Sequence, residues 1–260
     1  MHKNMVQVVG VSLILNLVFG LFVSAILHYG ATSLLSMMGL RPELMEYGVS
    51  YMKIVGAFAF FQAISLTISA SLRSANKAVY PMMVKVVVNI LNIIGNYSLI
   101  FGKFGMPALG VEGAAISTAF ARGVSMVILF VILFRKHIPR FPLSYFCPFP
   151  FVELKNLLKI GVPSAGENMS YSFSQVVLTY FINMLGNEAL ATRTYVVNIV
   201  MFVYLFAIAM AQGGAICIGH LVGERKIHAA YLLGKYVMRI SILVSLVLSC
   251  IWALMGHTLF

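Results

Sequence analysis

Long apolar stretches divide the chain into seven segments, separated by short connections that carry polar, glycine or proline residues. The stretches cover residues 5–27, 46–71, 79–101, 112–134, 157–183, 189–217 and 229–255. A helix rises 1.5 Å per residue, so about 20 apolar residues cross the roughly 30 Å hydrocarbon core of a bilayer. Because lipid offers no hydrogen bonds to the backbone, each stretch is predicted to be helical. The pattern predicts an all-α membrane protein, a polytopic helical bundle of about seven transmembrane helices.

The composition supports a protein whose surface faces lipid. Of the 260 residues, 61% are hydrophobic and only 10% are charged, whereas soluble domains carry about a quarter charged residues. The formal net charge of +11 comes from Lys and Arg that lie between the apolar stretches, not on one basic face. We therefore expect the lipid bilayer as a partner and no nucleic acid.

One connection is longer and different in kind from the others. Residues 135–156 hold four of the eight prolines, Pro139, Pro142, Pro148 and Pro150. Proline fixes φ and lacks an amide donor, so such a stretch is expected to be semi-extended. We predict three parts: a helical bundle over residues 1–134, a linker over residues 135–156 and a second bundle over residues 157–260.

Basic residues are distributed unevenly over the two sides that seven crossings create. Two, Arg41 and Lys103, lie on one side, and ten lie on the other: Lys3, Arg73, Lys77, Arg135, Lys136, Arg140, Lys155, Lys159, Arg225 and Lys226. Cytoplasmic loops of membrane proteins carry the excess of Lys and Arg. This predicts a multi-pass protein of the cell membrane whose N-terminus and linker are cytoplasmic.

A stripe of polar residues runs along the third stretch. Lys85, Asn89, Asn92 and Asn96 follow one another at spacings of four, three and four, which places them on one face of a helix. Polar groups avoid lipid tails, so the stripe indicates either the wall of a water-filled substrate cavity or hydrogen bonding between helices. Both interpretations stay open, and the four residues are substrate-cavity candidates.

The fifth stretch carries Pro163 and, one turn later, Glu167. The chain has no aspartate, and its other six glutamates lie in connections or near helix ends, so Glu167 is the one deeply placed carboxylate. An intramembrane carboxylate beside a cavity takes up and releases protons or holds a cation, which makes Glu167 an ion-coupling candidate. The alternative is a structural partner for Arg193 or Lys85. Ser174 and Gln175 follow on the same stretch as substrate-cavity candidates.

Nothing in the chain indicates an enzyme. The six histidines are scattered over connections and helix ends without a metal-binding or catalytic pattern, and no glycine-rich phosphate loop occurs. We expect no catalytic residue, no metal and no cofactor beyond a coupling ion. ATP-driven transport would need another subunit, because the sequence has no ATP-binding motif.

The run from Tyr80 to Arg122, which contains NILNIIGNYSLIFG, closely resembles two helices of the multidrug and toxic compound extrusion (MATE) family. Three further stretches fit the same family: Leu72–Ser74, Lys159–Pro163 and Gly213–Gly223. The resemblance covers essentially the whole chain. It implies a partial chain equivalent to MATE helices three to nine, with residues 1–134 as helices three to six and residues 157–260 as helices seven to nine.

The family has two six-helix lobes around a central cavity and exports cationic or amphipathic compounds in exchange for protons or sodium. The resemblance therefore implies multidrug efflux by a secondary antiporter, monomeric when complete, with a small-molecule substrate. Some members place a cation-binding Glu about two turns after the proline of helix seven. In this sequence that register falls near Tyr171, a further cavity candidate, and Glu167 lies one turn earlier.

Other functions remain open at the level of the sequence. A lipid-linked oligosaccharide flippase of the same superfamily would favour several cationic residues facing the cavity. A membrane acyltransferase would need a His/Asp pair near a membrane face, which the sequence lacks. A nonfunctional transporter fragment is the third alternative, since helices one, two and ten to twelve have no counterpart here.

Overall fold

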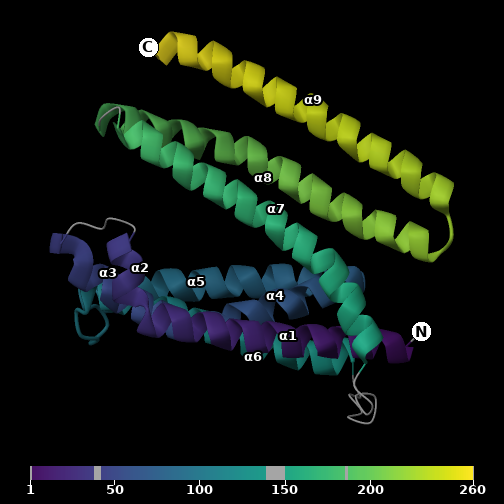
Figure 1. Cartoon of the computed structure of the whole chain (residues 1–260), viewed down its shortest axis with the longest axis horizontal. Helices are drawn as coiled ribbons and strands as arrows, with labels where there is room; N and C mark the ends of the chain where they lie inside the picture. The colour runs from purple at the N-terminus through teal and green to yellow at the C-terminus, as the bar shows by residue number, and fades with distance from the viewer. Residues whose placement is uncertain (1, 38–41, 139–149, 185–186, 260) are drawn as a thin grey trace. The chain divides into compact units, whose positions relative to one another are not determined.

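The computed structural model describes residues 2–37, 42–138, 150–184 and 187–259, and over these residues it contains helices and turns but no strand (Figure 1). The helices are α1 (His2–Tyr29), α2 (Ala31–Met37), α3 (Pro42–Ala57), α4 (Ala59–Ser74), α5 (Val79–Phe101), α6 (Gly110–Ile132), α7 (Phe151–Met184), α8 (Asn187–Gly223) and α9 (Ile227–Leu259). A π-helical turn, Leu133–His137, extends α6. The prediction of an all-α fold is confirmed.

Most of these helices are long and apolar enough to cross a bilayer. Within the described part of the chain, five meet that condition singly, α1, α5, α6, α8 and α9, and the pair α3–α4 makes a sixth if it is one span. The predicted fifth crossing, residues 157–183, falls on α7, which has 34 residues. It is long enough to cross a bilayer, but its middle section around Glu167 is polar.

The predicted second crossing, residues 46–71, is wrong as a single helix. The structure breaks it at Phe58 into α3 and α4, which are bent by 45° relative to one another. Gly56 lies just before the break and so close to α1 that an added Cβ would stand 2.5 Å from the Cβ of Leu27. Glycine permits both this approach and the local departure from helical geometry.

The break leaves backbone groups that α1 satisfies. The amide of Phe60 donates a hydrogen bond of 3.2 Å to the hydroxyl of Ser24, which is buried. Nδ1 of His28 lies 3.1 Å from the carbonyl oxygen of Lys53. An orphaned backbone group in hydrocarbon costs several kcal/mol, so these two side chains stabilise the bend.

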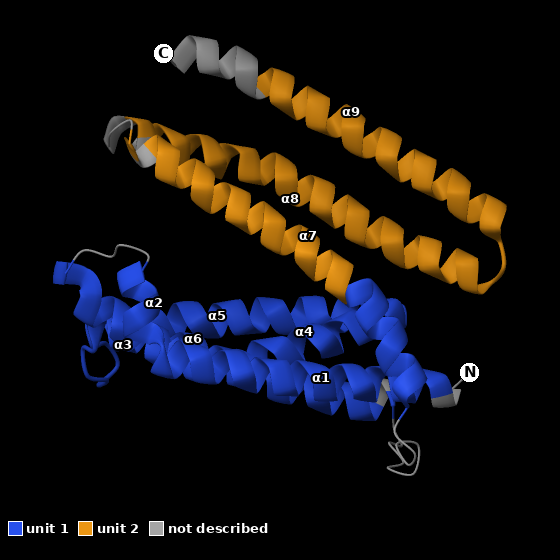
Figure 2. Ribbon diagram, viewed as in Figure 1, with its two compact units in different colours: residues 1–161 blue, residues 162–260 orange. Residues whose placement is uncertain are grey.

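The chain forms two compact units, residues 1–161 and 162–260 (Figure 2). In the first unit α1 packs on α3 and α4, and α6 packs on α3, α4 and α5. Its buried core gathers where α1 and α5 begin and where α4 and α6 end, with Val6, Ile68, Leu72, Val84 and Leu133 among its members. Ile68, Leu72 and Leu133 are fully buried.

The second unit contains the rest of α7 and an antiparallel hairpin of α8 and α9. Gly214 lets α9 approach α8 closely, because a Cβ there would lie 3.1 Å from Cγ1 of Val237. The turn between the helices holds an exposed ion pair, Lys226 Nζ to Glu224 Oε2, at 2.8 Å. The hydrogen bond from Lys226 and its charge lower the pKa of Glu224 below its usual value.

Half of the predicted linker, residues 139–149 of 135–156, lies outside the described residues. Helix α7 begins at Phe151, earlier than the predicted residue 157. The two compact units divide inside α7, between Gly161 and Val162, directly before Pro163. The three-part organisation with residues 135–156 as a linker stays a prediction.

Candidate functional site

The polar stripe on α5 separates into two exposed and two half-buried residues. Lys85 and Asn89 are exposed on this chain, whereas Asn92 and Asn96 are half-buried. Asn92 donates to Oγ1 of Thr118 at 3.4 Å, and Asn96 donates to Oδ1 of Asn92 at 3.1 Å. Asn92 therefore joins α5 to α6 and also binds Asn96, while the water-facing role of Lys85 and Asn89 stays a hypothesis.

Small residues let α5 and α6 come close enough for this network. Ser117 of α6 donates to the carbonyl oxygen of Asn92 at 3.3 Å. It faces Gly95, where an added Cβ would lie 2.4 Å from the Ser117 hydroxyl. Close backbone approach at glycine, with hydroxyl and amide groups bonding across the contact, is typical of helix pairs in membranes. We call this contact the α5–α6 seam.

The polar section of α7 is mostly exposed on this chain. Glu167, Tyr171 and Ser174 are exposed, and Gln175 is half-buried. Their spacing of four, three and one places them along one face of the helix. Among the described residues, none forms a hydrogen bond or ion pair with Glu167. The face thus presents a carboxylate without a partner, followed by a phenol, a hydroxyl and an amide.

Arg193 of α8 bonds to the far end of this α7 face. Its guanidinium donates to Oγ1 of Thr179 and, at 2.9 Å, to Oε1 of Gln175. Both acceptors are neutral, so Arg193 acts as a polar link between α7 and α8. The alternative in which Arg193 is the structural partner of Glu167 has no support in these contacts, and pairing of Glu167 with Lys85 stays a hypothesis.

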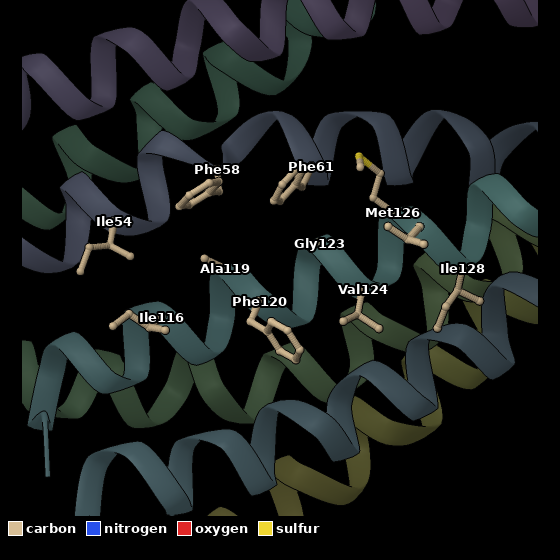
Figure 3. Close-up of a pocket in the computed structure, with 11 residues that line it drawn as sticks. Ile54, Phe58, Phe61, Ile116, Ala119, Phe120, Gly123, Val124, Met126 and Ile128 are labelled. Atoms are coloured by element: carbon tan, nitrogen blue, oxygen red, sulfur yellow. The ribbon is translucent and has the colours of Figure 1, made fainter. Parts of the chain in front are cut away.

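An apolar cavity of about 570 Å³ lies beside the break between α3 and α4. Figure 3 shows Phe58 and Phe61 facing Ile116, Phe120 and other apolar side chains of α6 across it. Pockets that bind small molecules measure about 300–1,000 Å³ and are mostly apolar. The sequence does not reveal this cavity, because the cavity lies beside the bend at Phe58, which forms where α3 and α4 contact α1.

Comparisons with known proteins fit a membrane transporter. The MatE family model matches residues 1–98 and 163–260. The uncharacterized transporter YisQ of Bacillus subtilis (strain 168) is 41% identical over 229 residues, which cover 88% of this chain and 50% of that protein. The probable multidrug resistance protein NorM of Thermotoga maritima is 32% identical over 66% of this chain and 37% of its own length. The chain thus spans half or less of the length of these relatives.

Solved structures share the fold. The structure described as MATE in the bent conformation superposes with a TM-score of 0.81 at 24% identity, over 97% of this chain and 61% of that one. A MOP superfamily transporter from Pyrococcus furiosus, described as having a binding pocket of reverse polarity, gives 0.81 over 98% and 61%. Since the family model accounts for most of the residues, the chain belongs to the MatE family, the multidrug and toxic compound extrusion transporters.

Proposed function

We propose that this chain forms part of the transport body of a secondary active transporter that exports cationic or amphipathic small molecules by antiport with protons or sodium. The observation that carries the proposal is Glu167, an exposed carboxylate without a described partner on the polar face of α7. Antiport needs a site whose affinity for ion or substrate differs between two conformations. A carboxylate that binds either a proton or a metal cation supplies such a site.

The position of Glu167 along α7 suits an ion-coupling site. It lies 16 residues beyond the start of α7 at Phe151, which corresponds to about 24 Å along the helix. Pro163 precedes it by one turn and removes the backbone hydrogen bond to the carbonyl oxygen of Lys159. A local change of charge at Glu167 therefore acts on a helix that is already weakened at the neighbouring turn.

The apolar cavity beside Phe58 supports an amphipathic substrate. Its described lining is aliphatic and aromatic, and its volume of about 570 Å³ matches that of a drug-sized molecule. Energy would come from the ion gradient, since the sequence holds no ATP-binding motif. The family consists of transporters, and we expect neither a catalytic residue nor a resident cofactor in this chain.

The proposed orientation places the N-terminus and residues 135–156 in the cytoplasm, on the basis of the ten Lys and Arg residues against two. We propose a monomer as the functional unit of the complete transporter. A lipid-linked oligosaccharide flippase would instead use cationic cavity residues. Arg193, one of the basic residues inside the helices, is engaged by neutral acceptors of α7.

Glu167→Gln tests the proposal, because it keeps the shape of the side chain and removes its charge and its titration. We expect near-normal expression and membrane insertion of the variant, and complete loss of ion-coupled efflux. The assay is extrusion of a fluorescent cation such as ethidium from cells that express the whole gene in a strain without other efflux pumps. Glu46→Gln, an exposed carboxylate on α3, is the matched control.

Each outcome of this assay is informative. Undiminished, pH-dependent efflux by Glu167→Gln would reduce Glu167 to a structural residue and remove the support for the proposed coupling site. If the unaltered protein extrudes no cation but moves a lipid-linked oligosaccharide across vesicles, the flippase alternative is correct. If it transports neither, the proposed efflux of cations is contradicted.

A further inference from the structure

The first unit carries an arginine near the middle of a membrane span. Arg122 lies on α6, 12 residues after the helix begins at Gly110 and 10 residues before it ends at Ile132, which corresponds to about 18 Å and about 15 Å along the helix. Its side chain is half-buried and forms no hydrogen bond or ion pair with a described residue. A cation at this depth is costly, so it normally pairs with another group of the protein or with a bound molecule.

Arg122 lies beside the polar stripe of α5. Thr118, which accepts the hydrogen bond from Asn92, precedes Arg122 by four residues and so lies on the same face of α6. Lys85 and Asn89 precede Asn92 by seven and three residues and share its face of α5. Because Asn92 and Thr118 are bonded to one another, the two faces lie on the same side of the helix pair.

The antiparallel arrangement of α5 and α6 brings these residues to the same level. Residue numbers rise on α5 as they fall on α6 along the seam, from Gly95 beside Ser117 to Leu99 beside Gly113. The exposed half of the stripe and Arg122 therefore lie in the same direction from the hydrogen bond that joins the helices. We call this group the basic patch, which consists of Lys85, Asn89 and Arg122.

The charge of the basic patch has no carboxylate to balance it on its own helices. Helix α5 contains no glutamate, and the chain has no aspartate. The one glutamate of α6, Glu112, lies 10 residues before Arg122, about 15 Å along the helix. Glu112 accepts a hydrogen bond of 2.6 Å from Ser50 of α3. The two cations of the patch therefore attract an anion from elsewhere.

The side chains of the basic patch are mainly hydrogen-bond donors. A guanidinium offers five N–H donors and no acceptor, an ammonium offers three donors, and an amide offers two. Lys85 and Asn89 are exposed, and neither bonds to another described residue. The planar guanidinium of Arg122 matches the paired oxygens of a carboxylate or a phosphate. Charge and hydrogen bonding together favour an oxyanion.

Apolar side chains flank the basic patch on α5. Val86 and Ile93, three residues before and four residues after Asn89, share its side of the helix and are 50% and 67% exposed. A molecule at this depth of the bilayer gains free energy by burying apolar surface against such side chains. The surroundings of the patch therefore favour an oxyanion that is attached to an apolar body.

We propose that the basic patch binds the oxyanion of an amphipathic molecule, a carboxylate or a phosphate, while Val86 and Ile93 contact its apolar body. The inference rests on the proposed function in that this molecule is a transported compound. It belongs to the amphipathic compounds named there and not to the cationic ones. The first unit thus holds the negative charge of the ligand, and ion coupling stays with Glu167.

The experiment measures equilibrium binding to the whole purified protein in phosphatidylcholine nanodiscs at neutral pH. The probes are 4-phenylbutyrate, which is ionised at this pH, and 4-phenylbutanamide, a neutral molecule of the same shape. We expect the anion to bind about tenfold more tightly than the amide. Arg122→Gln should weaken binding of the anion about tenfold and leave that of the amide unchanged. Lys85→Gln should weaken the anion about threefold, since this lysine is exposed.

Matched controls come from basic residues outside the basic patch. Arg239 of α9 and Lys53 of α3 are exposed, and Arg239→Gln and Lys53→Gln should change neither affinity. Arg122→Lys keeps the charge and should lose less affinity for the anion than Arg122→Gln, which separates loss of charge from misfolding. If the two probes bind equally, or if Arg122→Gln behaves like Arg239→Gln, the inference is overturned.

Two further arms identify what occupies the basic patch. Replacing part of the phosphatidylcholine with phosphatidylglycerol distinguishes the sources of the oxyanion. Displacement of 4-phenylbutyrate would support the patch and assign it to a lipid phosphate, whereas unchanged binding would support a free compound. If Glu167→Gln strengthens binding of the anion, the two cations serve Glu167 within the protein and the inference is overturned.

Binding and transport results separate the two proposals. Binding of 4-phenylbutyrate that depends on Arg122, in a protein without ion-coupled efflux, would support the basic patch and contradict the proposed function. Efflux that depends on Glu167, with binding of the anion unaffected by Arg122→Gln and Lys85→Gln, would support the proposed function and overturn the basic patch.

Discussion

Gly113 offers a direct test of how closely α5 and α6 approach one another. A Cβ built on Gly113 would lie 2.5 Å from the carbonyl oxygen and 2.7 Å from the carbonyl carbon of Leu99 on α5. These are backbone atoms, so no rotamer change can relieve the contact. Reaching ordinary contact near 3.4 Å requires α5 and α6 to separate by about 0.9 Å at this turn.

The cost of Gly113→Ala follows from this separation. Overpacking at a tight contact costs about 1–3 kcal/mol. Two hydrogen bonds of the seam, from Ser117 to the Asn92 carbonyl and from Asn92 to Thr118, already measure 3.3 and 3.4 Å and would be lost. Each is worth about 0.6 kcal/mol in a membrane protein. Alanine regains about 1 kcal/mol of helix propensity, so the net destabilisation is about 2 kcal/mol.

Thermal unfolding of the purified protein in detergent, followed by fluorescence, measures this effect. A loss of about 2 kcal/mol lowers the Tm of a protein of this size by about 4–8 °C. The control is Gly123→Ala on the same helix, where the new Cβ would meet the ring edge of Phe61 at 3.2 Å. That ring turns more easily than a backbone moves, so a smaller change is expected. An unchanged Tm for Gly113→Ala would refute the close approach of α5 and α6.

Two further predictions concern single side chains. In Lys226→Gln the pKa of Glu224 should rise toward its ordinary value, because the lysine holds it low. Carboxyl carbon chemical shifts measured by NMR against pH test this. In the unaltered protein the ion pair should be lost only as the pH falls through the lowered pKa of Glu224. In a variant without cysteines, Asn89→Cys should react faster with a water-soluble maleimide than Asn92→Cys, which lies in the seam. Equal rates would place both residues in the same surroundings.

Much of the fold could be predicted because the bilayer imposes its length and polarity on every crossing helix. The predicted helix 79–101 coincides with α5, whose left-handed Gly102 ends it. The break at Phe58 could not be predicted, since no proline marks it. It depends on Ser24 and His28 of α1, and their contact with α3 and α4 exists only in the folded bundle.

For the polar stripe on α5, the spacing of residues predicts a shared helical face but not what that face contacts. Spacing alone placed Asn89, Asn92 and Asn96 on one helical face, yet both a water-filled cavity and a helix contact require such a face. The hydrogen bond from Asn92 to Thr118 of α6 shows that Asn92 lies in a helix contact. The sequence alone does not predict which helix packs against a polar face.

Helix α7 brings the fold and the proposed function together. It has 34 residues, and yet it is not among the helices found apolar enough to cross a membrane singly. A helix surrounded by lipid on all sides could not carry Glu167, Asn168 and Ser170, because each would lose its hydrogen bonds to water. A helix that faces a hydrated path must carry such groups, and they lower its hydropathy. The low mean hydropathy of α7 is therefore expected if this helix holds the proposed coupling carboxylate.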